Sequence, residues 1–334
     1  MIAISTRVME DAIALFKGDI LQYSEDLKHK LSSLHYNSAF SSTEKDYLAL
    51  LLSMATDIIT MDADEIEKAK VRFGNIIPGA TMERKVHKAF RKSLIEIMGY
   101  SSLRANFYPK FFRKIGLKSC VYCNSQLAIT TASKKTLANG KGKINSRFQL
   151  DHFWPQAKYP CFSISLYNLY PVCACCNNSK GKHHVNFRLY DSKITPAGSI
   201  FTFTLKNDAK ARYLLTRDPN MLSISFKGPE TPKGKKSHEL VFDIEGIYDT
   251  QTDLAEELLL KVLVYTETYK KALVRNFPKI FRNELVLTRL IVGNYIEERD
   301  IHKRPLSKFT MDLARQVGLI SKRGGDCKIN CVKG

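Results

Sequence analysis

Two pairs of cysteines constrain this chain more than any other feature of its sequence. Cys120 and Cys123 form one C-x-x-C unit, and Cys173 and Cys176 form a second, with 49 residues between the pairs. Each pair supplies two thiolates from a tight turn, so together they can surround one tetrahedral zinc ion and join two distant segments. The alternative is that the cysteines are reduced and pack as small apolar side chains. Two pairs in loop-like surroundings favour the structural zinc site.

The other four cysteines give weaker signals. Cys175 leaves one alternative open, because Cys173-x-Cys175 could also chelate a metal. Cys161 is predicted to be an ordinary buried thiol. Cys327 and Cys331 form a C-x-x-x-C unit without a partner pair, so we assign them no role.

The sequence gives no sign of a membrane or secretory protein. No apolar stretch approaches the ~20 residues that a membrane-spanning helix needs, and no secretory signal is visible near the N-terminus. We therefore expect a cytoplasmic location and no membrane partner.

Positive charge is concentrated in the middle of the chain. The sequence has 52 Lys and Arg against 33 Asp and Glu, a net charge of +19. Residues 81–190 hold 19 of the basic and only 3 of the acidic side chains. Such a concentration attracts a polyanion and predicts salt-dependent binding of nucleic acid. A solvated basic surface, or contact with anionic lipid, explains the same composition. Composition alone therefore does not distinguish these alternatives, and the sequence motifs are needed to do so.

Periodicity predicts an α+β fold. Apolar residues at helical spacing predict helices over 11–34 and 82–98 and again from residue 252 onward, and an alternating pattern predicts strands between 199 and 226. We therefore expect an α-rich protein with a small antiparallel β segment. Its predicted regions are helical 1–105, a central zinc-containing module 106–195, the β segment 196–240 and a helical C-terminal region 241–334.

A polar motif lies between the cysteine pairs. Asp151 and His152 follow a strand-like stretch, Asn168 comes later, and Asn177 follows the second cysteine pair, nine residues after Asn168. This order, nested within two C-x-x-C units, resembles the HNH endonuclease family, also called ββα-metal or His-Me finger nucleases. The resemblance covers roughly residues 118–184. It implies a central ββα-metal module that hydrolyses phosphodiester bonds.

Each residue of the motif has a chemical reason. A neutral histidine can take a proton from water near pH 7, which makes His152 the candidate general base. The Asp151 carboxylate and the Asn177 amide oxygen suit a catalytic Mg²⁺ or Mn²⁺ ion. Asn168 resembles the family's middle asparagine, which hydrogen-bonds backbone across the loop and orients the base. Many members have histidine where this chain has Asn177. Taken singly, an Asp-His pair is ordinary, and such asparagines are turn or helix-cap residues.

Basic residues near the motif are candidates for nucleic-acid contacts. The insert before Asp151 predicts a basic hairpin with a turn at Asn139-Gly140, although a solvated loop is the alternative. Two further lysines fall where the family's helix faces the phosphate backbone. His183 and His184 could contact phosphate or a metal, or could simply be exposed polar residues. Trp154 is expected to pack rather than stack on a base. The candidate lysines are Lys134, Lys135, Lys141, Lys143, Lys180 and Lys182.

These observations predict a metal-dependent HNH endonuclease, with DNA favoured as substrate. An RNA or tRNA endonuclease using the same site is an open alternative, because the site touches sugar-phosphate and no base code. A zinc-dependent nucleic-acid-binding module without catalysis is another. The motif segments are also similar to HNH nuclease subunits of bacterial antiphage systems, Septu-type and retron-associated, which implies a defence effector with a partner ATPase. The C-terminal helices either dock such a partner or complete the fold.

Overall fold

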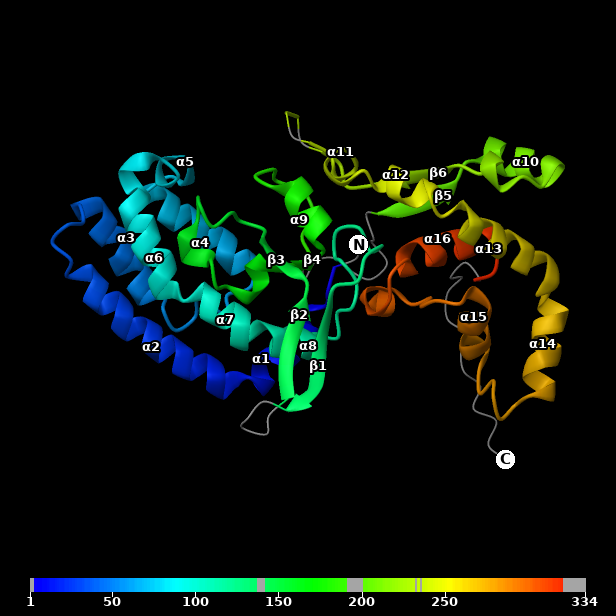
Figure 1. Cartoon of the computed structure of the whole chain (residues 1–334), viewed down its shortest axis with the longest axis horizontal. Helices are drawn as coiled ribbons and strands as arrows, with labels where there is room; N and C mark the ends of the chain where they lie inside the picture. Colours follow the sequence, from blue (N-terminus) through cyan, green and yellow to red (C-terminus); the bar gives the residue numbers. More distant parts are fainter. Residues whose placement is uncertain (1–2, 137–141, 191–200, 232, 235, 321–334) are drawn as a thin grey trace.

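A computed structural model of the chain describes residues 3–136, 142–190, 201–231, 233–234 and 236–320 (Figure 1). Within these residues the predicted α+β class is confirmed, because helices predominate and the strands form three antiparallel sheets of two strands each. No helix in this described part has the length and apolar character that crossing a membrane requires. The division of the chain into four regions stays a prediction.

The N-terminal region forms a helical lobe, on the left of Figure 1. The helix predicted over 82–98 begins only at Lys88, because Arg84 has extended backbone and interrupts the turns before it. Its end is fixed by Gly99, whose φ of 64° is the left-handed conformation that glycine tolerates. The elements are α1 (Thr6–Leu15), α2 (Lys17–His35), α3 (Ser42–Ser53), α4 (Ala63–Ile76), α5 (Gly79–Met82), η1 (Lys85–His87), α6 (Lys88–Met98), α7 (Tyr100–Asn106) and α8 (Tyr108–Ile115).

The central region holds two small sheets. The predicted hairpin is present in its strands, β1 (Ile129–Thr136) and β2 (Gly142–Arg147), which pair antiparallel, while the turn at Asn139-Gly140 lies outside the described residues. The second sheet pairs β3 (Gln149–His152) with β4 (Leu169–Val172), and α9 (Ala174–Lys180) follows β4. Short 3-10 turns, η2 (Pro160–Phe162) and η3 (Leu166–Asn168), lie between the two strands. The ring of Phe162 lies 5.8 Å from that of Phe73 in α4, so the core of the N-terminal lobe continues beneath this loop.

The run of strands predicted between 199 and 226 is only partly right. Between β5 (Thr202–Leu205) and β6 (Ile224–Lys227) the chain forms the helix α10 (Asn207–Thr216) and the turn η4 (Pro219–Met221). Two features favour the helix there. Ala209 and Tyr213 are buried four residues apart on one face, and Asp208 pairs with Arg212 at the same spacing.

The C-terminal region forms a second helical lobe, on the right of Figure 1. Its last helix packs across β5, where the Asp312 carboxylate accepts a hydrogen bond from the Phe203 amide. The elements are α11 (His238–Phe242), α12 (Ile244–Asp249), α13 (Thr252–Val264), α14 (Glu267–Asn276), α15 (Glu284–Val292), η5 (Glu298–Lys303) and α16 (Ser307–Val317).

Candidate functional site

The four cysteines of the two C-x-x-C units converge, as the sequence predicts. Their sulfur atoms all lie within 4.8 Å of one another, and all four side chains are buried. Burial raises the pKa of the Cys120 thiol well above its usual value, while hydrogen bonds from neighbouring cysteines lower the pKa of Cys173. Four buried sulfur donors at this spacing could hold a metal such as zinc. We call these residues, Cys120, Cys123, Cys173 and Cys176, the cysteine cluster.

The local fold explains how the second pair is presented. Cys173 is the N-cap of α9, and its sulfur accepts a hydrogen bond from the Cys176 amide at 3.4 Å. Cys175 points away from the cluster and is exposed, so the alternative chelate through Cys175 is not formed. Cys161 is a buried thiol outside the cluster, as predicted, and burial raises its pKa to about 12.

Buried polar side chains bind the first cysteine pair to the C-terminal lobe. Asn124 accepts a hydrogen bond from the Lys308 amide (2.9 Å) and donates to the Ile301 carbonyl (3.2 Å). The Tyr248 hydroxyl donates to the Cys123 carbonyl at 2.8 Å. His238 donates to the Tyr122 carbonyl at 2.9 Å, and burial lowers the pKa of His238 to about 4, which keeps its ring neutral.

Sequence reasoning missed these supports, although one signal was visible. An asparagine follows each C-x-x-C unit, Asn124 after the first and Asn177 after the second. Asn124 has a φ of 57°, a left-handed conformation for which asparagine is among the preferred residues after glycine. The residue type therefore suits the turn that closes the first cysteine pair.

The Asp151 carboxylate lies at the end of β3 and is already paired with a cation. The Lys180 ammonium is 2.9 Å from Oδ2 and 3.0 Å from Oδ1, and it also donates to the His152 carbonyl at 3.2 Å. The Tyr122 hydroxyl donates to Oδ2 at 2.7 Å. Asp151 is 7% exposed and Lys180 only 1%. A buried carboxylate thus has a neutralising partner and a second hydrogen-bond donor.

The prediction that Lys180 faces a phosphate backbone is therefore wrong in this structure. Helix α9 lies against β3, so Asn177 and Lys180, three residues apart on one helix face, meet Gln149 and Asp151, two residues apart on one strand face. The rotation of α9 about its own axis therefore turns the Lys180 side chain inward, where the Asp151 carboxylate compensates its charge.

The two predicted ligands of a catalytic cation are close but separately engaged. The Asn177 amide donates to Gln149 Oε1 at 2.6 Å, and no hydrogen bond among the described residues joins Asn177 to Asp151. A carboxylate and an amide oxygen are donor types that Mg²⁺ accepts. The position beside Asp151, however, is taken by Lys180, so a metal ion could bind there only if this ammonium moved away.

His152 is held in a defined orientation. Its Nε2 atom is 2.9 Å from the Ser163 carbonyl, so Nε2 carries the proton and Nδ1 keeps the lone pair. The Tyr100 ring lies against it, with centroids 4.9 Å apart. Burial lowers the pKa of His152, which favours the neutral imidazole. This is the protonation state that a general base requires at pH 7.

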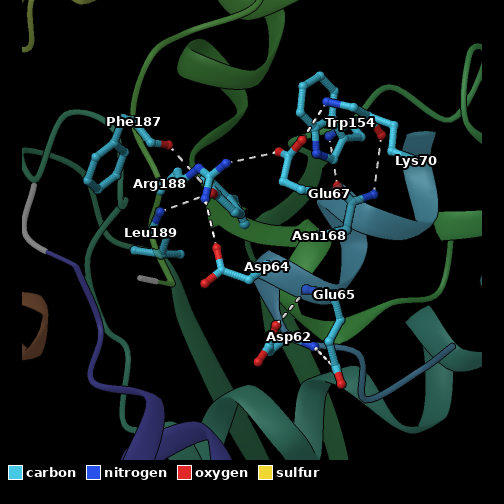
Figure 2. Close-up of polar contacts among 11 residues, drawn as sticks. Asp62, Asp64, Glu65, Glu67, Lys70, Trp154, Asn168, Phe187, Arg188 and Leu189 are labelled. Carbon is cyan, nitrogen blue, oxygen red and sulfur yellow. Dashed lines mark hydrogen bonds and ion pairs between the residues drawn. The ribbon is translucent and has the colours of Figure 1, made fainter. Parts of the chain in front are cut away.

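Asn168 hydrogen-bonds the backbone on both sides of the loop that follows His152, as the sequence predicts. Its Oδ1 accepts from the Trp154 amide at 2.7 Å (Figure 2), and its Nδ2 donates to the Phe162 carbonyl at 2.9 Å. The Phe162 carbonyl precedes Ser163, the hydrogen-bond partner of His152. Asn168 therefore fixes the peptide immediately before the one whose carbonyl orients the histidine.

Trp154 packs into the protein, as predicted. The Lys70 ammonium lies 3.5 Å from the centre of its ring, and the His184 ring stacks on it at 5.1 Å. In Figure 2, α4 also holds the segment after α9, because Asp64 and Glu67 form ion pairs with Arg188 at 3.4 and 3.1 Å. The loop beyond His152 is thus bound to the N-terminal lobe.

The remaining candidate lysines differ in what the structure says of them. Lys182 is fully at the surface, with its side chain 88% exposed, and forms an ion pair with Glu83 at 3.3 Å. Lys134 and Lys135 belong to β1 and Lys143 belongs to β2, while Lys141 lies outside the described residues. Their role in binding nucleic acid stays a prediction.

The chain was compared with protein-family models, curated proteins and solved structures, and none of them matches it. The resemblance to HNH endonucleases therefore rests on the motif residues and their spacing alone.

Proposed function

We propose that the chain is an HNH endonuclease that hydrolyses phosphodiester bonds of nucleic acid, with His152 as the general base. The observation that supports this most is the orientation of His152. It stands at the end of β3 beside Asp151, its Nε2 proton is fixed by the Ser163 carbonyl, and the peptide before that carbonyl is held by Asn168. Such a fixed, neutral imidazole beside a carboxylate is what water activation requires.

In this proposal Nδ1 of His152 takes a proton from a water molecule. The water oxygen forms a bond to phosphorus, the bond from phosphorus to the leaving oxygen breaks, and a second water protonates that oxygen. Mg²⁺ or Mn²⁺, when bound through Asp151 and Asn177, supplies the positive charge that stabilises the phosphate and the leaving oxygen. The cysteine cluster holds a structural zinc ion.

DNA is the favoured substrate, and RNA or tRNA cut by the same site is the alternative. The motif resemblance further supports a nuclease effector of a bacterial antiphage system that acts with a partner ATPase. A zinc-dependent binding module without catalysis is the second candidate function. It is favoured by one observation, the Lys180 ammonium at the Asp151 carboxylate.

The test compares wild type with His152→Ala on plasmid DNA and on total RNA in the presence of Mg²⁺. Loss of a general base typically lowers a rate by ~10²–10⁴, so cleavage by the variant should be undetectable or very slow. Zinc content and nucleic-acid binding should stay near wild type. His29→Ala, a change at an exposed histidine in α2, is the matched control and should cleave normally.

Equal cleavage rates for wild type and His152→Ala would remove the nuclease assignment from this site. Binding without cleavage of either substrate by the wild-type protein would favour the non-catalytic module. The substrate that is cut decides between DNA and RNA.

A further inference from the structure

A cavity beside the candidate site has a chemistry that the proposed reaction does not use. It has a volume of about 450 Å³, a size typical of small-ligand sites, and its lining includes Trp154, Tyr159 and His184. Three lysines complete it, and each comes from a different segment. Lys158 lies in the loop after β3, Lys182 follows α9, and Lys236 precedes α11. We call this cavity, with its three lysines and its aromatic lining, the lysine pocket.

The lysine pocket is strongly electropositive. Its described lining contains no carboxylate. The nearest acidic partner is Glu83, which serves two of the lysines at once, Lys158 at 3.9 Å and Lys182 at 3.3 Å. Lys236 has no carboxylate partner among the described residues and lies 3.2 Å from His183 Nε2. One acidic group against three ammonium groups leaves a net positive charge, which favours an anion.

The pocket adjoins the candidate catalytic residues. Trp154 is two residues beyond His152, and Lys182 is two residues beyond Lys180, the partner of Asp151. Two residues of chain span at most about 7 Å. Successive phosphates of a DNA strand rise by about 3.4 Å along the helix axis and lie further apart than that through space, because the backbone winds around the axis. A strand bound at His152 is therefore long enough for a neighbouring phosphate to reach the lysines.

We propose that the lysine pocket binds a backbone phosphate of the nucleic-acid strand, next to the bond that is cut. Trp154 and Tyr159 form an apolar wall beside the attached nucleoside, without the base stacking on Trp154, whose ring already packs against Lys70 and His184, while the ammonium groups hold the phosphate. This proposal rests on the proposed function in one respect, namely that a nucleic-acid strand binds at His152. A free nucleotide shares the same chemistry, so the experiment has to separate the two sources.

Trp154 is the only tryptophan of the chain, so its fluorescence reports on the pocket directly. The probe is a ten-residue oligothymidylate, titrated into the full chain carrying His152→Ala so that the strand stays intact. We expect a saturable change in Trp154 emission. Thymidine monophosphate and inorganic phosphate are titrated in parallel and should bind at least tenfold more weakly.

The decisive variant replaces Lys158, Lys182 and Lys236 by Ala. We expect at least a tenfold weaker affinity for the oligonucleotide. The slope of log affinity against log salt should fall by about 0.7, since the pocket holds one phosphate and each phosphate contact on a single strand contributes about that much. The matched control replaces three exposed lysines of α2, Lys17, Lys28 and Lys30, and removes the same charge outside the pocket lining.

Equal affinity and slope in the two triple variants would overturn the proposal, as would an unresponsive Trp154 at saturating oligonucleotide. Thymidine monophosphate binding as tightly as the oligonucleotide would also overturn it, because the pocket would then take free nucleotides. None of these results depends on cleavage. The proposed nuclease function fails separately, if His152→Ala cuts at the wild-type rate.

Discussion

The cysteine cluster and the Asp151 site are built on the same helix, yet they treat positive charge in opposite ways. Helix α9 supplies Cys176 to the cluster near its start and Lys180 to the Asp151 carboxylate at its end. No cationic side chain of the described residues hydrogen-bonds to the four sulfur atoms, whereas Asp151 has a buried ammonium 2.9 Å away. One centre thus has room for an added cation, and the other already contains one.

This difference predicts a metal that stabilises the fold at one centre and a metal that the other centre only admits. Among the described residues, the four buried thiols receive hydrogen bonds from the Cys176 amide and the Ser125 hydroxyl but none from a cationic side chain, so ionised thiols there would gain from an added cation. The Asp151 carboxylate is satisfied without any ion, so a catalytic metal there competes with Lys180. Removing metal should therefore have very different consequences at the two centres.

The largest effect is expected at the cysteine cluster. Cys176→Ser should give insoluble or unfolded protein, because apparent binding energies of structural zinc are about 10–16 kcal/mol and become folding energy. The matched control is Cys175→Ser, which changes the exposed neighbour and should leave the melting temperature and zinc content unchanged. The measurements are solubility, thermal unfolding and elemental analysis, with about one zinc per chain expected in the wild type. Well-folded wild-type protein without metal would break the comparison.

A smaller effect is expected at the Asp151 site. Lys180→Met leaves a buried carboxylate without its partner, which costs about 3–5 kcal/mol for pairs of this kind. The opened position should then admit a divalent ion, so Mg²⁺ or Mn²⁺ should raise the melting temperature of the variant more than that of the wild type. Lys182→Met, at an exposed lysine two residues on, should change stability by no more than about 0.5 kcal/mol.

The comparison at Asp151 has a clear point of failure. If Lys180→Met is as stable as the wild type, the ion pair does not balance the carboxylate. If both proteins gain equally from Mg²⁺, Lys180 does not compete with a metal ion. Either result would make the two centres alike in needing an external cation.

The sequence predicts the cysteine cluster better than the Asp151 site for a physical reason. Two C-x-x-C pairs most often bind one metal ion together, so their spacing alone predicts that Cys120 and Cys176 converge. Lysine is almost always exposed, and nothing in the sequence gives the rotation of α9 relative to β3 that buries Lys180. The Tyr122 hydroxyl bond to Asp151 depends on tertiary packing in the same way.

Long-range supports are the second class of features that sequence patterns miss. Tyr248 and His238 reach the first cysteine pair from more than 110 residues away in the chain, and a periodicity argument carries no information on such contacts. Asn168 was found because its partners are local, within fourteen residues along the chain. Helix α10 was missed because two short apolar patterns on either side favoured continuous strands.

The smallest effect on the fold is expected from the hairpin β1–β2, which leaves both centres intact. Because lysine side chains are usually solvated, replacing Lys134, Lys135, Lys141 and Lys143 by Ala should change stability by no more than about 0.5 kcal/mol. If the hairpin lies along nucleic acid, the slope of log affinity against log salt should fall by up to about 3–4 on duplex DNA, because fewer counterions are released. The control removes four lysines of the helices that are exposed, Lys17, Lys28, Lys30 and Lys271.

Affinity is measured at several salt concentrations for both four-site variants, with zinc content as a check on the fold. A slope that falls only in the hairpin variant assigns these lysines to the substrate. It would also show that the excess positive charge in the middle of the chain contributes to nucleic-acid binding, whereas Lys180 forms a buried ion pair with Asp151. An unchanged slope would mean that the hairpin is solvated surface, and the lysine pocket beside His152 would then have to supply the phosphate contacts.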